Sequence, residues 1–222
     1  QRYHDRVAVN ERVDAAVRAP AVEVVTLSDP GQRPAERDGW RQVTATGVYD
    51  PAHTVLVRAR TFEHQVGYEV LVPLRLSDGS AVLVDRGWIP SSSAGAATRP
   101  DIPPVPGGQV SVTGRLRLPE SSPGPLTQTD GLVEVRRIDP MRIGRVLPYP
   151  VLGGWLSVEV ADPGLRAVAA QPDRQPIWMN VAYVIQWWLF AAMVPFGFVW
   201  LARREAGERT EPGVTVTYPS RR

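Results

Sequence analysis

The sequence of 222 residues has no cysteine and no lysine, and only three histidines and three methionines. Without cysteine it cannot form disulfides, a Cys-ligated zinc site, a thiol redox centre or a covalent c-type haem attachment. Copper(I) delivery through thiolates is excluded too, because this soft ion prefers sulfur ligands. The 25 basic residues, all arginine, nearly balance 23 acidic ones. This balance argues against a nucleic-acid-binding protein, which usually concentrates basic residues on one face.

Patterns that carry catalysis are also lacking. His4, His53 and His64 have no metal-ligand spacing and are interpreted as surface or turn residues. There is no glycine-rich phosphate loop and no nucleophile elbow, and the serines at 91–93 have no base at a recognisable spacing. The sequence therefore predicts neither an enzyme nor a metal site.

One long apolar segment decides the class of protein. Between Ile177 and Ala202 the only strongly polar side chains are Asn180 and Gln186. Crossing the hydrocarbon core of a bilayer, about 30 Å thick, takes roughly 20 mostly apolar residues. The alternative, a buried helix of a soluble protein, seldom has more than about 14 uninterrupted apolar residues. We therefore predict a transmembrane helix over residues 177–202.

Arginine counts beside this segment predict its orientation. Residues 157–176 contain only Arg166 and Arg174, whereas five arginines follow the segment: Arg203, Arg204, Arg209, Arg221 and Arg222. Because basic residues favour the cytoplasmic side, we expect the tail at 203–222 to be cytoplasmic and the main domain to be extracytoplasmic.

The rest of the chain divides by composition. Residues 1–27 are expected to begin with an amphipathic helix over 2–18, and residues 28–39, rich in Pro, Gly and charge, are expected to be a linker. Residues 40–176 are expected to be a β-rich domain of about seven antiparallel strands, arranged as a barrel or sandwich. The expected strands are Gln42–Tyr49, Thr54–Arg60, Tyr68–Leu76, Ala81–Ile89, Val110–Leu118, Leu132–Ile138 and Trp155–Val160.

Between the strands, three connections have recognisable chemistry. Asp78-Gly79 predicts a hairpin with a type I′ turn, which needs two residues of positive φ. Ser91–Gly108, rich in Ser, Ala, Pro and Gly, is expected to be a loop. Asp139–Val146 is expected to contain a short helix.

The stretch from Val82 to Pro90 places a charged residue, Arg86, in the middle of a strand. We predict that Arg86 pairs with an acidic side chain or a carbonyl, because a buried charge needs a partner. The glycine that follows, Gly87, is expected to occupy a bulge or bend, and Pro90 to end the strand.

A second group of residues lies at the start of the apolar segment. Spacings of three and four bring Asn180, Tyr183, Gln186 and Trp187 toward one helix face at the outer membrane boundary. Polar groups at that depth usually face protein or water rather than lipid. The alternative is a plain aromatic anchor in the headgroup region.

Together these stretches resemble the Surfeit locus protein 1 family. Its first pattern, G-Y-x-V-x-x-P followed by V-L-V-[ND]-R-G-[WF]-[IV]-P, is matched by Gly67, Tyr68, Pro73, Arg86, Gly87, Trp88 and Pro90. Its second membrane helix opens with His-x-x-Tyr-x-x-x-Trp-aromatic. Here that pattern is Asn180, Tyr183, Trp187 and Trp188.

The resemblance implies a membrane-anchored assembly or accessory factor for aa3-type cytochrome c oxidase, supporting haem a placement or oxidase stability. It implies a first membrane helix ahead of Gln1, a bacterial plasma membrane and, for the actinobacterial branch, an oxidase that works in a supercomplex with cytochrome bc. Haem a contact is expected to be transient, with no tightly bound cofactor. Asn180 replaces the family's His, and a carboxamide is a weak iron ligand beside imidazole. Asn180, Tyr183, Gln186 and Trp187 are the candidate haem-proximal or partner contacts on the helix, and Arg86 is the expected polar contact on the domain.

Two other functions stay open at this point. The first alternative to an assembly factor is a permanent structural subunit of the bc–oxidase supercomplex with no haem role. The second is a haem-binding carrier. A subunit would be stoichiometric with mature oxidase, whereas an assembly factor would be enriched on haem-deficient precursors. A carrier would show haem absorbance when purified.

Overall fold

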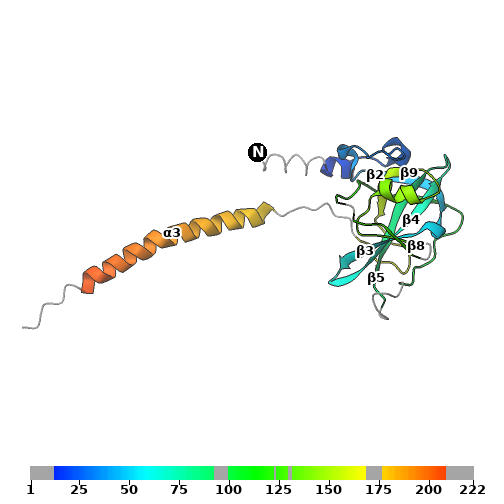
Figure 1. Cartoon of the computed structure of the whole chain (residues 1–222). Helices are drawn as coiled ribbons and strands as arrows, with labels where there is room; N and C mark the ends of the chain where they lie inside the picture. Colours follow the sequence, from blue (N-terminus) through cyan, green and yellow to red (C-terminus); the bar gives the residue numbers. More distant parts are fainter. Residues whose placement is uncertain (1–12, 93–99, 123, 130–131, 169–176, 209–222) are drawn as a thin grey trace, which may run out of the picture. The chain divides into compact units, whose positions relative to one another are not determined.

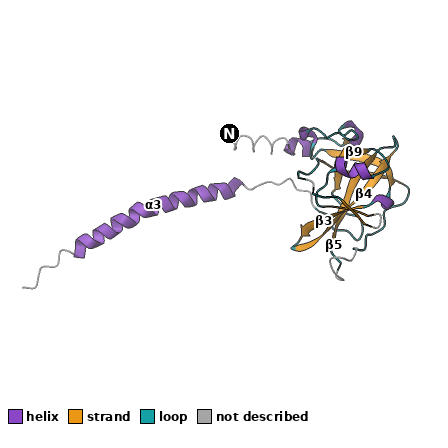
Figure 2. Cartoon of the chain, viewed as in Figure 1, coloured by secondary structure: helices purple, strands orange, loops and turns teal. Residues whose placement is uncertain are grey.

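The computed structural model describes residues 13–92, 100–122, 124–129, 132–168 and 177–208 (Figure 1). The chain divides into two compact units, residues 1–172 and 173–222. Among the described residues, the first unit contains all the strands and the second contains one long helix (Figure 2). The expected amphipathic helix is helical over its described part, residues 13–18, and its earlier residues lie outside the described ones.

The first unit is built on a nine-stranded sheet in the order β1-β2-β6-β9-β5-β4-β3-β8-β7. The strands are β1 Val22–Glu23, β2 Gln42–Tyr49, β3 Val55–Phe62, β4 Gln65–Leu76, β5 Ala81–Pro90, β6 Gln109–Arg117, β7 Thr127–Thr129, β8 Leu132–Val135 and β9 Val151–Val158. The short helices are η1 Val24–Thr26, η2 Glu36–Asp38, η3 Pro51–His53, α2 Pro140–Ile143 and η4 Gly144–Val146.

The sheet closes on itself because β4 is long enough to pair with three strands. Its first part pairs with β3, most of its length pairs with β5, and its end, Leu74–Leu76, pairs with Gly47–Tyr49 of β2. This last pairing closes the ring β2-β6-β9-β5-β4, from which β3, β8 and β7 extend. The expected barrel is therefore present as a small closed ring.

Strand direction was predicted incorrectly for two pairs of expected strands. β5 pairs in parallel with β9 and β3 with β8, and the short β1 is also parallel to β2, so the sheet is mixed rather than antiparallel. Apolar alternation predicts which face a residue occupies but carries no information about the direction of its neighbour. The prediction also missed β1 and β7, which have two and three residues and too short a pattern to detect.

The segment 28–39 is part of the barrel and not the expected linker. Ser28 is buried, and its hydroxyl accepts a hydrogen bond from Gly154 N–H at 2.9 Å. The carbonyl of Asp29 accepts from Gly153 N–H at 3.0 Å. A Cβ on Gly153 would lie 1.7 Å from the Gln32 carbonyl oxygen, so only glycine permits this approach. The proline, glycine and charged residues of this segment therefore indicate irregular backbone packed on the barrel, not an independent linker.

The hairpin at Asp78-Gly79 forms, but with another turn. Gly79 has φ +85°, whereas Asp78 is not among the residues with positive φ, which a type I′ turn would require. Leu76 N–H donates to the Ser80 carbonyl at 2.8 Å, closing a three-residue loop. The expected short helix after Asp139 is confirmed as α2 followed by η4.

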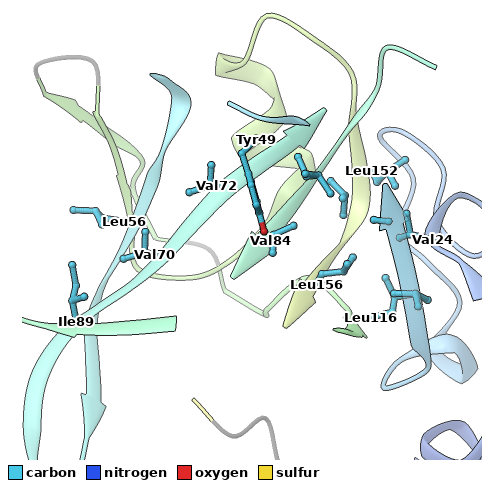
Figure 3. Packing of buried hydrophobic residues seen from close by; sticks show 14 of the residues in the cluster. Val24, Tyr49, Leu56, Val70, Val72, Val84, Ile89, Leu116, Leu152 and Leu156 are labelled. Atoms are coloured by element: carbon cyan, nitrogen blue, oxygen red, sulfur yellow. The ribbon is translucent and has the colours of Figure 1, made fainter. Parts of the chain in front are cut away.

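Two apolar clusters lie on opposite faces of β5. Val82 and Val84 belong to the first cluster, shown in Figure 3, together with Tyr49. Leu83, between them in the sequence, belongs to the second cluster, beneath β8 and α2. Being buried on both faces, β5 has an almost continuous apolar sequence instead of a polar alternation.

The second unit contains α3, Ile177–Glu208, which confirms the predicted apolar helix. Its stretch from Ile185 to Arg204 has 20 residues and a mean hydropathy of 1.6, with none of it buried. At 1.5 Å per residue this stretch is about 30 Å long, the thickness of a hydrocarbon core. The helix continues past Ala202 into the expected tail, as far as Glu208.

Candidate functional site

Arg86 lies inside the barrel end with its side chain only 1% exposed. Its Nε donates to Asp162 Oδ2 at 2.5 Å, and its two terminal nitrogens donate to the carbonyls of Pro103 and Pro104 at 3.0 and 2.8 Å. The predicted acidic or carbonyl partner is thus confirmed, and both kinds are present. The guanidinium ties β5 to the loop after residue 100 and to the segment after β9.

Tyr49 is the aromatic neighbour of this arginine. The Arg86 guanidinium carbon lies 6.0 Å from the Tyr49 ring centre. Burial raises the pKa of Tyr49 to about 12, and the Asp162 carboxylate adds to this while Arg86 opposes it. The phenol therefore stays neutral, and the ion pair of Arg86 with Asp162 carries the charge at this end of the barrel.

Gly87 occupies a β-bulge, as predicted. Across β4 and β5, Glu69 pairs with Trp88 and Leu71 with Asp85, so Arg86 and Gly87 together oppose Val70 alone. Gly87 has φ +133°, a conformation that only glycine adopts readily. A Cβ there would also lie 2.8 Å from the Arg166 carbonyl oxygen.

After the bulge, Trp88 pairs with the chain beyond β9. Trp88 N–H donates to the Arg166 carbonyl at 2.8 Å, and Arg166 N–H returns a bond at 2.9 Å. The Trp88 indole N–H donates to the Arg60 carbonyl at 3.0 Å. Residues 161–166, here named the exit segment, precede α3 in the chain. Consecutive residues of the β5 motif hold this segment against the barrel.

The other motif residues have structural roles. Gly67 pairs with Pro90 across the hairpin, and Tyr68 packs against the first apolar cluster. Pro73 is buried in β4, and its carbonyl accepts from Asp50 N–H at 2.8 Å. The structure thus brings the β4 and β5 motif residues together as one packed unit.

Sequence reasoning missed a buried ionic cluster on the other face of the same strands. Arg60 donates to both carboxylate oxygens of Glu120, at 2.7 and 2.8 Å. Its Nε lies 2.9 Å from Glu69 Oε2, but neither atom makes an aligned hydrogen bond. Asp85, 4% exposed, accepts from Gly87 N–H at 3.0 Å, and Arg117 is the second cation near these acids.

Burial and the neighbouring charges favour the protonated form of one carboxyl group in this cluster. Burial raises the pKa of Asp85 to about 8. The neighbouring Glu69 adds to this rise, while the hydrogen bond from Gly87 N–H and the charges of Arg60 and Arg117 oppose it. Burial also raises the pKa of Glu69. With Asp85 neutral, two arginines balance the two glutamates, Glu69 and Glu120. The charged residues within apolar strands were the only signal that could have indicated such a cluster.

The helix residues belong to the other unit. Tyr183 and Trp187 are 59% and 70% exposed, and Gln186 is exposed as well. Trp187 packs edge-on against Phe190, with ring centres 6.3 Å apart. Asn180 is in the first turn of α3, but its side chain lies outside the described ones. The exposed polar and aromatic groups are therefore free to meet a partner or the lipid headgroups.

The histidines form no metal site in the described part of the chain. His53 Nδ1 lies 2.8 Å from Asp50 Oδ2, which also accepts from the Tyr149 hydroxyl at 3.0 Å. His64 is at the β3–β4 hairpin tip with φ +65°, and His4 lies outside the described residues. The described residues contain no group of three or more His, Asp or Glu suited to a metal ion.

These features define a membrane-anchored barrel protein, with a closed mixed β-domain and an apolar helix long enough to cross a bilayer. The pattern that defines the SURF1 family matches residues 1–192, and the chain belongs to this family. It is 32% identical over 203 residues to an uncharacterised SURF1-like protein of Mycobacterium tuberculosis, covering 90% of this chain and 73% of the relative. A SURF1-like protein of Mycobacterium bovis matches to the same extent. The family is known generally for cytochrome oxidase assembly factors.

Proposed function

We propose that this chain is a non-enzymatic assembly or accessory factor for aa3-type cytochrome c oxidase, supporting haem a placement or the stability of the oxidase. Family membership supports the oxidase as partner. The observation that carries the proposal is the exposed start of α3, where Tyr183, Gln186 and Trp187 offer polar and aromatic contacts. The family match extends to residue 192 and so includes this part of the helix.

The helix is a better candidate for partner contact than the barrel motif. Arg86 and Trp88 are buried, and their hydrogen bonds are satisfied within the β-domain. Gln186, in contrast, is exposed within the span that begins at Ile185. In lipid there is little hydrophobic drive for helix association, so packing and polar contacts select the partner. A glutamine at this depth is costly unless it faces protein or water.

The proposal includes a location and a cofactor relationship. The chain is anchored in the bacterial plasma membrane with the β-domain outside and residues after Ala202 in the cytoplasm, since arginines gather there. It contacts the oxidase alone or within its supercomplex with cytochrome bc. Haem a is a transient neighbour, because Asn180 offers an amide where an imidazole would ligate iron.

Affinity purification of the tagged full chain in mild detergent, with quantitative mass spectrometry, tests this function. We expect oxidase subunits to co-purify, and to be enriched when haem a synthesis is blocked and precursors accumulate. Recovery at a fixed stoichiometry with mature oxidase only would instead identify a permanent subunit. Purification without oxidase subunits in either condition would overturn the proposal.

A further inference from the structure

A pocket of about 380 Å³ lies beside the end of β6, away from Arg86 and its partners. Its wall combines apolar groups with two arginines: Val13, Glu36, Arg37, Gly39, Trp40, Leu116, Arg117 and Leu118. This volume lies within the range of small-molecule sites, which are usually apolar with a few convergent polar groups.

Arg117 is held in this wall by two tryptophans. Its guanidinium carbon lies 3.7 Å from the centre of the Trp40 ring and 5.3 Å from that of Trp155. Stacking of this kind fixes the guanidinium plane and leaves its N–H groups directed outward along the plane. The arginine is therefore preorganised before any ligand arrives.

The backbone at Trp40 is strained at the position of this stack. Trp40 has φ +71°, in the left-handed region that a bulky side chain rarely adopts. Its N–H donates to the Leu116 carbonyl at 2.7 Å, which fixes the residue beside β6. Such strain costs about 1–3 kcal/mol and gathers at functional sites.

Two arginine side chains at this pocket make no direct ion pair with a described residue. The Arg117 guanidinium makes no hydrogen bond and no ion pair within 4.0 Å there, and the same holds for Arg37. Glu36, which also lines the pocket, is already paired with Arg33 at 2.9 Å. On the buried side of Arg117, the acids Glu69 and Glu120 form their direct ion pairs with Arg60, while their charge also acts on Arg117 from more than 4.0 Å away.

We propose that this pocket binds a carboxylate or phosphate group carried on a small, partly apolar molecule. Arg117 would receive the oxyanion on its stacked, planar fork, and Arg37 would add a second positive charge from the rim. The apolar side chains at the pocket surface, Val13 and Leu118, would contact the rest of the ligand. A guanidinium fork matches both oxyanions, since each presents paired oxygens.

Indole N–H signals of the full chain, labelled with ¹⁵N-tryptophan in neutral detergent, test the site. The probes are butyrate, its neutral isostere butyramide, and inorganic phosphate. We expect a saturable shift of the Trp40 signal, assigned with Trp40→Phe, for butyrate or phosphate and none for butyramide. The stronger anion identifies the carboxylate or the phosphate as the preferred group. Equal shifts with butyramide, or no saturable shift with either anion, would overturn the proposal.

Variants separate the two arginines from general charge effects. Because the Arg37 side chain is exposed, Arg37→Gln should weaken anion binding only roughly threefold. Arg117→Lys should weaken it roughly tenfold, because the planar guanidinium is lost. Arg145→Gln, an exposed arginine outside this pocket, is the matched control and should leave binding unchanged. Anion binding that is equal in wild type and Arg37→Gln, or weakened as much by Arg145→Gln, would contradict the assignment.

Discussion

The indole of Trp88 lies directly against Gly67 on the neighbouring strand. A Cβ at position 67 would come 2.5 Å from Trp88 Cζ2 and 2.1 Å from the Ile89 carbonyl oxygen. The two residues belong to separate parts of the family motif, and the sequence alone gives no reason for their pairing. In the structure, the absence of a side chain at Gly67 leaves the space that the Trp88 indole occupies.

The first prediction concerns this contact. Gly67→Ala should lower the free energy of unfolding of the β-domain by about 2 kcal/mol or more, since the overpacked site cannot relax away from backbone. Chemical denaturation of the full chain in detergent, followed by near-UV circular dichroism, measures this. Gly107→Ala is the matched control, because a Cβ there meets no atom within 4 Å. Equal stability of the two variants would contradict the packing role of Gly67.

Gly87 provides the second prediction. Gly87→Ala should destabilise the domain by about 2–4 kcal/mol, from left-handed backbone strain together with the close approach to Arg166. Gly108→Ala separates the two effects, because Gly108 has φ +76° but open space around it. A Gly87→Ala protein no less stable than Gly108→Ala would show that the bulge tolerates a side chain.

A third prediction concerns the three acceptors around Arg86. Arg86→Lys keeps the charge but cannot reach Asp162, Pro103 and Pro104 together, so at least one buried acceptor loses its bond. The expected loss is about 2 kcal/mol in the same denaturation measurement. Arg33→Lys, whose side chain pairs with exposed Glu36 and makes only a long 3.4 Å bond to the Pro119 carbonyl, should change stability by less than about 0.5 kcal/mol. Similar losses for both variants would refute the special role of Arg86.

The fourth prediction concerns the pH dependence of stability. The pKa of Asp85 is about 8 in the folded state and near 4 when unfolded. Between these values the folded state holds a proton that the unfolded state has released. Stability should therefore fall as pH rises through this window, by at most about 1.4 kcal/mol per pH unit from this group.

Asp85→Asn tests this directly, because the amide oxygen can still accept from Gly87 N–H while no proton is exchanged. Unfolding free energies measured from pH 5 to pH 9 should decline less steeply in the variant than in the wild type. Asp78→Asn, in an exposed turn, is the control. The same slope in wild type and Asp85→Asn would show that Asp85 is ionised throughout.

Local chemistry was predictable from sequence, and long-range pairing was not. A charge in the middle of an apolar strand must find a partner, and a glycine after it favours a bulge, so both expectations for Arg86 and Gly87 are confirmed. The partner itself, Asp162, is 76 residues away. Its identity depends on the parallel pairing of β5 with β9, which alternation cannot indicate.

The ionic cluster could not be predicted for the same reason. Glu69, Asp85 and Arg117 come from three strands whose neighbours are set by the closure of the sheet. Segment 28–39 had the composition of a linker, yet its backbone at Gln32 lies against Gly153 and its Pro34 ring lies against Gly154. The helix, in contrast, follows from composition alone, since no partner strand is needed to define it.

The fifth prediction concerns the proposed contact between the start of α3 and oxidase subunits. Gln186→Leu makes the segment more apolar, so membrane insertion should be kept while one interhelical hydrogen bond is lost. We expect association with the oxidase to weaken by about 0.5–2 kcal/mol, roughly 2- to 30-fold, with Ile185→Leu at the same depth unchanged. The measurement is quantitative recovery of oxidase subunits with the tagged full chain at equal membrane levels of each variant. Recovery that falls for Gln186→Leu alone supports this contact, and recovery equal to wild type contradicts it.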